Sequence, residues 1–88
     1  MCLGIPCEVI GLLDDDLATV SVSGVEREVS IELLLDEGVA IGDWVLVHVG
    51  FALSKINAEE AQMTLDQIKR LGQVWHDELD AFKETAIR

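Results

Sequence analysis

The chain has 88 residues, half of them hydrophobic, and it carries 17 Asp and Glu against 6 Lys and Arg, for a formal net charge of −11. This length fits one small domain, and the charge opposes binding to nucleic acids and anionic membranes, because both attract proteins mainly through phosphate groups. A basic protein surface is a better-matched partner. The only cysteines, Cys2 and Cys7, form no disulfide framework and cannot alone complete a tetrahedral zinc site.

Targeting signals are not evident in the sequence. No basic region followed by an apolar run resembles a signal peptide, and the longest apolar stretch, residues 44–53, is too short to cross a bilayer. We therefore expect a cytoplasmic protein.

The N-terminal tip, residues 1–6, places Cys2 directly after Met1. Removal of Met1 would leave the thiol and the α-amine on adjacent carbons, where they could chelate one metal ion. The neighbouring ammonium would also favour the reactive thiolate. Pro6 favours an extended, stiff arm. From these residues alone, a chain end that merely happens to contain cysteine is an equally good reading.

Residues 7–35 show the pattern of β-strands. An apolar run over residues 7–13 ends at three aspartates, residues 17–23 alternate apolar and polar, and Ser23-Gly24 suits a hairpin turn. Residues 25–31 alternate again, with Ser30 outward and Arg27 interrupting the inward row, either at a barrel mouth or with its charged end reaching to solvent. Residues 33–35 fit either a strand end or a helical turn.

The strongest strand begins after Gly42-Asp43. Its alternation predicts one face with Trp44, Leu46 and His48 and an opposite face with residues 45, 47, 49 and 51. Gly50 within this run indicates a bulge or the close approach of another backbone.

A helix follows from Ala58 to about Leu71. Asn57 is a good N-cap and Glu60 stands at the third helical position, which together form a capping box. Beyond it we expect a bend or a second helix. The apolar stripe is Ala61, Leu65, Ile68, Gly72, Trp75, Leu79 and Phe82.

These elements predict a mainly β fold, a small OB-like β-barrel with a C-terminal α-helix. We expect a single domain, in which residues 1–57 form the barrel with its N-terminal cysteine tip and residues 58–88 form a C-terminal helical segment.

Three segments resemble the HypC/HupF/HybG family of [NiFe]-hydrogenase maturation chaperones. They are Met1-Cys2-Leu3-Gly4-Ile5-Pro6, the strand Gly42-Asp43-Trp44-Val45-Leu46-Val47-His48-Val49-Gly50-Phe51-Ala52, and Glu60-Ala61 with Thr64-Leu65. The resemblance covers about residues 1–71. It implies the same barrel-and-helix fold and a chaperone rather than an enzyme.

The resemblance also implies a function. The family carries an iron centre, Fe(CN)2CO, from an iron–sulfur scaffold protein of the HypD type to the precursor of the hydrogenase large subunit. Cys2 matches the family's iron- and partner-binding cysteine after Met1 removal, and His48 matches a motif histidine that would assist it. Transient iron is the only cofactor implied. Cys7 departs from the usual Pro-Gly tip and fits best as a small buried residue opening the first strand.

Two other functional classes use the same features. A small OB-fold module for nucleic acid needs a basic groove with stacking aromatics, whereas this chain is acidic and has four aromatic residues. A thiol-dependent enzyme would need an acid–base pair, for which Cys2 and His48 are the candidates. The stripe through Trp75 and Phe82 is read as core, with an exposed docking seam as the alternative.

Overall fold

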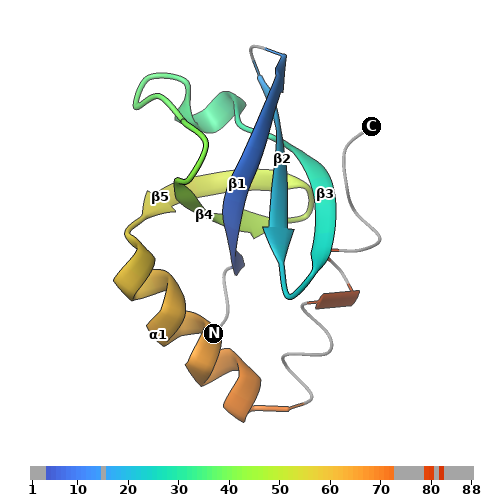
Figure 1. Ribbon diagram of the computed structural model, residues 1–88, viewed down its shortest axis with the longest axis vertical. Helices are drawn as coiled ribbons and strands as arrows, with labels where there is room; N and C mark the ends of the chain where they lie inside the picture. Colours follow the sequence, from blue (N-terminus) through green and yellow to red (C-terminus); the bar gives the residue numbers. More distant parts are fainter. Residues whose placement is uncertain (1–3, 15, 73–78, 81, 83–88) are drawn as a thin grey trace.

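The computed structural model describes residues 4–14, 16–72, 79–80 and 82. They form a closed barrel with strand order β1-β2-β3-β5-β4, followed by helix α1 (Figure 1), which confirms the expected fold class. The described residues 79–80 and 82 are helical as well. The elements, in chain order, are β1 Ile5–Asp14, β2 Leu17–Val22, β3 Val25–Ser30, the 3-10 helix η1 Glu32–Leu34, β4 Trp44–His48, β5 Phe51–Ile56 and α1 Ala58–Arg70.

The barrel core follows the period-two pattern of the strands. In β2, Ala18, Val20 and Val22 are buried, and in β4 Val45 and Val47 are buried between more exposed neighbours. All neighbouring strands pair antiparallel except β3 and β5, which meet in parallel at Ser30 and Phe51. This short parallel contact closes the barrel.

The β2–β3 and β4–β5 hairpin turns are alike in backbone geometry. Ser23 and Gly24 have φ values of 50° and 80°, and Val49 and Gly50 have 54° and 81°. Two successive residues with positive φ are typical of the type I′ hairpin turn. The first turn confirms the prediction. The second shows that one continuous strand with a bulge at Gly50 was wrong, because the chain reverses there and begins β5.

Three side chains depart from the predicted faces. Val49 and Phe51 were expected on the face of Val45 and Val47, but Val49 is 53% exposed at the hairpin tip and Phe51 pairs directly with His48. Ser30 was expected outward but is buried. Ser30 lies where β3 meets β5: its amide donates to the Gly50 carbonyl at 2.9 Å and its Oγ accepts from the Glu32 amide at 3.3 Å. Burial is tolerated because these polar groups are satisfied.

Other ambiguous segments are resolved by the structure. Residues 32–34 form a 3-10 turn that buries Leu34, so the helical reading of the leucine run was right. Arg27 is half-buried in the inward row, and its guanidinium donates to the Glu26 carbonyl at 2.7 Å in an exposed bond. Its aliphatic stem therefore covers the barrel while its charge remains near solvent.

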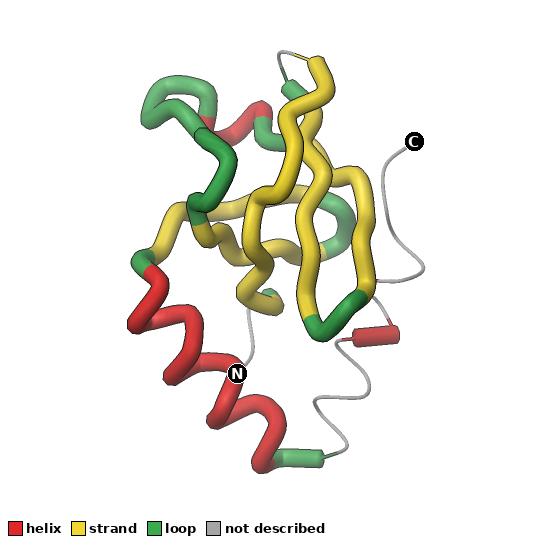
Figure 2. The backbone as a smooth tube through the Cα atoms, in the orientation of Figure 1, coloured by secondary structure: helices red, strands yellow, loops and turns green. Residues whose placement is uncertain are grey.

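Helix α1 begins and ends close to the predicted positions. The Asn57 side chain accepts from the Glu60 amide at 2.7 Å, and Glu60 accepts from the Asn57 amide at 3.3 Å, which completes the capping box. Its buried residues, Ala61, Leu65 and Ile68, face the barrel, where α1 contacts β1 and β4. The tube in Figure 2 shows α1 running past the end of the barrel at which β1 begins. No helix in the described part of the chain could span a membrane.

The C-terminal stripe joins the core at two described positions. Phe82 is buried in the same cluster as the barrel valines, and Leu79 packs against that cluster. The sequence analysis interpreted the stripe as core, with an exposed docking seam as the alternative. Leu79 and Phe82 support the core interpretation. Trp75 lies outside the described residues.

Candidate functional site

The candidate site lies where β1 begins and β4 ends. Cys2 is outside the described residues, which start at Gly4. Gly4 is buried, and a Cβ atom added to it would lie 2.8 Å from the Val47 carbonyl oxygen. Glycine is therefore required for the backbone of the tip to approach the backbone of β4 this closely.

Strand register places His48 beside the start of the chain. Ile5 pairs with Val47 in an antiparallel ladder, so one further step brings Gly4 opposite His48. Two peptide units join Gly4 to Cys2, which limits their Cα separation to about 7 Å. The register thus places Gly4, which follows the cysteine-containing tip in the sequence, opposite the imidazole-bearing His48 at one end of the barrel.

The β4–β5 hairpin presents His48 outward. His48 is the last residue of β4, is exposed, and pairs with Phe51 just before the turn at Val49 and Gly50. It shares the outer face with Trp44 and Leu46, as the alternation predicted, because Val45 and Val47 point into the core. An exposed imidazole can ligate a metal ion or donate a hydrogen bond to a ligand.

The part of the chain that the structure describes contains no preformed metal-binding site with several protein ligands. Among those residues, no group of three or more histidine, cysteine or acidic side chains could hold a metal ion. A centre bound here would therefore take few ligands from the barrel itself.

Cys7 lacks the accessible thiolate that a metal ligand or a nucleophile needs. Its side chain is fully buried, and its Sγ donates to the Ile5 carbonyl at 3.5 Å. Burial raises the pKa of the Cys7 thiol far above its usual range, since the thiolate would lose its hydration. Cys7 therefore remains a protonated core residue, which confirms the predicted burial. The strand was predicted to open at Cys7, but β1 begins two residues earlier at Ile5, because Ile5 and Pro6 already pair with β4.

An ion pair holds the loop that leads into β4. Lys55 on β5 lies 3.3 Å from the Asp43 carboxylate and donates to the Gly38 carbonyl at 2.9 Å. The Ala40 amide donates to the same carboxylate at 2.9 Å; this bond, with the charge of Lys55, lowers the pKa of Asp43. These contacts hold residues 38–43 against β5.

Sequence reasoning missed two features that position the site, the packing of Gly4 and the turn at Val49-Gly50. The role of Gly4 was not foreseen, because its close contact depends on Val47, which is far away in the sequence. The turn at Val49-Gly50 carried a readable signal, a glycine between two apolar alternating runs, but valine is unusual at a positive-φ position.

The fold and this end of the barrel define a class: a small acidic β-barrel protein whose sequence begins with Met-Cys and whose buried Gly4 lies opposite an exposed histidine. A family model described as the HupF/HypC family matches residues 1–68. The chain therefore belongs to the HupF/HypC family.

Individual relatives cover nearly the whole chain. It is 44% identical over 78 residues to "Hydrogenase maturation factor HypC" of Helicobacter hepaticus, which spans 89% of this chain and 90% of that protein. It is 48% identical over 86 residues to "Frd operon uncharacterized protein C" of Proteus vulgaris, covering 93% and 88%. It is 44% identical over 75 residues to "Hydrogenase maturation factor HybG" of Escherichia coli, covering 81% and 92%.

Proposed function

We propose that this protein is a hydrogenase maturation chaperone of the cytoplasm. It receives iron bearing cyanide and carbon monoxide, Fe(CN)2CO, from an iron–sulfur scaffold protein of the HypD type. It then delivers this iron to the precursor of the [NiFe]-hydrogenase large subunit. Membership of the HupF/HypC family and relatives named hydrogenase maturation factors support the proposal. The iron is cargo, not a resident cofactor.

The observation that carries the proposal is the packing of Gly4 on Val47, one register step from His48. The covalent link from Gly4 limits the distance of Cys2 from this position to about 7 Å between Cα atoms. A soft thiolate suits iron that already holds cyanide and carbonyl ligands. His48 is exposed and would orient the thiolate or contact the iron ligands.

Transfer requires that the iron can leave. One thiolate, with at most an α-amine beside it, leaves most of the coordination shell to the cyanide, carbonyl and partner ligands. The described barrel adds no cage of ligands that would retain the iron. Cys7 does not compete for it, because its buried thiol stays protonated.

Cysteine substitutions test the carrier role. In a strain lacking its own chaperone of this family, Cys2→Ser should abolish hydrogenase activity, while the purified variant keeps its fold and loses the infrared bands of iron-bound cyanide and carbonyl. Cys7→Ser is the matched control: it should lower stability by about 1–2 kcal/mol, because a buried hydroxyl replaces the thiol, yet retain iron. Full maturation by Cys2→Ser would overturn the proposal.

A glycine substitution tests the position of the tip. Gly4→Ala would place a methyl group 2.8 Å from the Val47 oxygen, so the start of β1 must shift. We expect a loss of about 1–3 kcal/mol in the free energy of unfolding and reduced maturation. Gly11→Ala is the control, since its added Cβ would meet Thr19 at an ordinary 3.7 Å. Equal maturation by the two folded variants would show that the packing of Gly4 is unimportant for function.

A further inference from the structure

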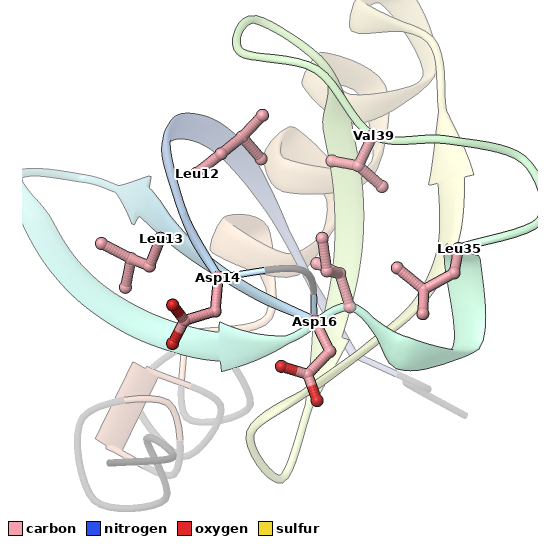
Figure 3. A pocket seen from close by; sticks show the side chains of 7 residues that line it. Leu12, Leu13, Asp14, Asp16, Leu35 and Val39 are labelled. Carbon is pink, nitrogen blue, oxygen red and sulfur yellow. The ribbon is translucent and has the colours of Figure 1, made fainter.

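A second surface feature lies at the opposite end of β1 from Gly4. An open groove of about 860 Å³ is lined by Leu12, Leu13, Asp14, Asp16, Ile31, Leu35 and Val39. Figure 3 shows leucine and valine side chains around the hollow and the two carboxylates along one side. None of these residues takes part in the site at the tip.

The apolar lining of the groove is exposed for a local structural reason. Leu12 and Leu13 are consecutive in β1 and would normally face opposite sides of the strand. A register irregularity between Leu12 and Asp14 allows both to line the groove. They are 47% and 49% exposed, and Leu35 across the groove is 50% exposed. Three half-exposed leucines around one hollow form a clustered apolar surface, the kind that marks interaction sites, rather than scattered apolar residues.

The negative charge of the groove determines which kind of partner it can bind. Among the described residues that line the groove, the charged groups are the carboxylates of Asp14 and Asp16, and the whole chain carries a formal charge of −11. A second copy would bring the same carboxylates and the same net charge against them, which is repulsive. A nucleic acid is opposed for the same reason.

We propose that this groove binds a segment of a partner protein in which apolar side chains are flanked by lysine or arginine. The leucines bury the apolar side chains, and the Asp14 and Asp16 carboxylates pair with the flanking cations. β1 has ten residues, so about 30 Å of strand separates the groove from Gly4. A partner held in the groove therefore leaves the cysteine tip free.

A defined peptide tests the proposal on the full-length chain. The probe is a synthetic amphipathic helix of leucine and lysine, and its binding site is mapped by amide NMR shifts at low and high salt. We expect the largest shifts at the groove residues. Leu13→Ser with Leu35→Ser should weaken binding at least about tenfold through lost apolar burial. Asp14→Asn with Asp16→Asn should weaken it several-fold, and only at low salt.

Matched variants control for nonspecific binding of the peptide to exposed carboxylates and exposed apolar side chains outside the groove. Met63→Ser with Leu71→Ser removes exposed apolar groups on and beside α1, and Asp66→Asn with Asp80→Asn removes two exposed carboxylates elsewhere. Both controls should bind the peptide like the unmodified chain, and so should Cys2→Ser, which separates this test from that of the carrier role.

Three results would overturn the proposal. In the first, the control variants weaken binding as much as the groove variants. In the second, a peptide with glutamate in place of lysine binds equally well. In the third, the chain forms a dimer that Leu13→Ser with Leu35→Ser abolishes, which would make the groove a self-association surface.

Discussion

At the scale of single residues, the two cysteines show how position decides chemistry. Cys7 has no solvent exposure, and burial raises the pKa of its thiol, so neither metal binding nor nucleophilic attack is available to it. Cys2 precedes the described residues and the buried Gly4 that fixes the beginning of β1. The same side chain therefore has a structural role at one position and a proposed carrier role five residues earlier.

The raised pKa of Cys7 predicts a loss of stability in alkali. In the unfolded chain the thiol ionises near its ordinary pKa of about 8.5, whereas in the folded protein it stays protonated. Its contribution is complete below about pH 8.5 and is lost as the pH rises, at up to about 1.4 kcal/mol per pH unit. Urea unfolding between about pH 7 and 10 measures the effect.

Cys7→Ala is the control for this pH dependence. It retains every other titrating group, so the difference in unfolding free energy between the two proteins should shrink steadily above about pH 8.5. Parallel curves across the range would mean that Cys7 ionises equally well in the folded protein.

At the scale of elements, the β4–β5 hairpin links a strained turn to the candidate site. Val49 has a φ of 54°, in the left-handed region that β-branched side chains rarely adopt, and it directly follows His48. The positive φ lets a two-residue turn reverse the chain, so that His48 pairs with Phe51 at the end of the ladder. The placement of His48 thus depends on the geometry of this turn.

Replacing the strained residue should stabilise the protein. Val49→Asn puts a residue that tolerates positive φ into the turn, and little burial is lost because Val49 is 53% exposed. We expect a gain of about 1 kcal/mol, or a rise of about 4–8 °C in melting temperature. Thermal unfolding followed by circular dichroism measures it.

Leu53→Asn provides the comparison for the turn variant. Leu53 is also an exposed apolar residue of this hairpin, but it lies in β5 without a positive φ. It should give no gain, since asparagine is unfavourable in strands. An equal gain in both variants would attribute the effect to polarity and not to relief of backbone strain.

At the scale of the whole molecule, the core extends beyond the barrel. Leu65 of α1 and Phe82 near the C-terminus are buried in one cluster with the barrel valines. A barrel of short strands in an 88-residue chain buries a limited apolar area. Leu65 of the helix and Phe82 therefore contribute substantially to the stability of the protein.

Shortening the buried Phe82 side chain should strongly destabilise the folded protein. We expect Phe82→Ala to lower the free energy of unfolding by about 3–5 kcal/mol, a large part of the 5–15 kcal/mol typical of folded domains. Asp80→Ala, at an exposed neighbouring position, should change it by less than about 0.5 kcal/mol. Chemical denaturation of both variants makes the comparison, and a loss below about 1 kcal/mol for Phe82→Ala would contradict the placement of Phe82 in the core.

Whereas β4 and β5 were predicted as one strand, strands β1 to β3, the first hairpin turn, helix α1 and its cap were readable from the sequence. They depend on signals between near neighbours: the alternation in residues 17–22, the Ser23-Gly24 pair, and the Asn57 and Glu60 pair. The family resemblance was readable as well, because its motifs are contiguous segments, and it supplied Cys2 and His48 as candidates.

Only the tertiary structure decided which distant residues meet. The contact of Gly4 with Val47 and the burial of Ser30 depend on the pairing of β1 with β4 and of β3 with β5, strands that are far apart in the chain. The groove likewise joins β1 to the segment after η1, through a register irregularity that no periodic pattern encodes. Local sequence specifies backbone conformation and side-chain alternation, whereas register and closure minimise the free energy of the whole core, so they emerge only when all strands are in place.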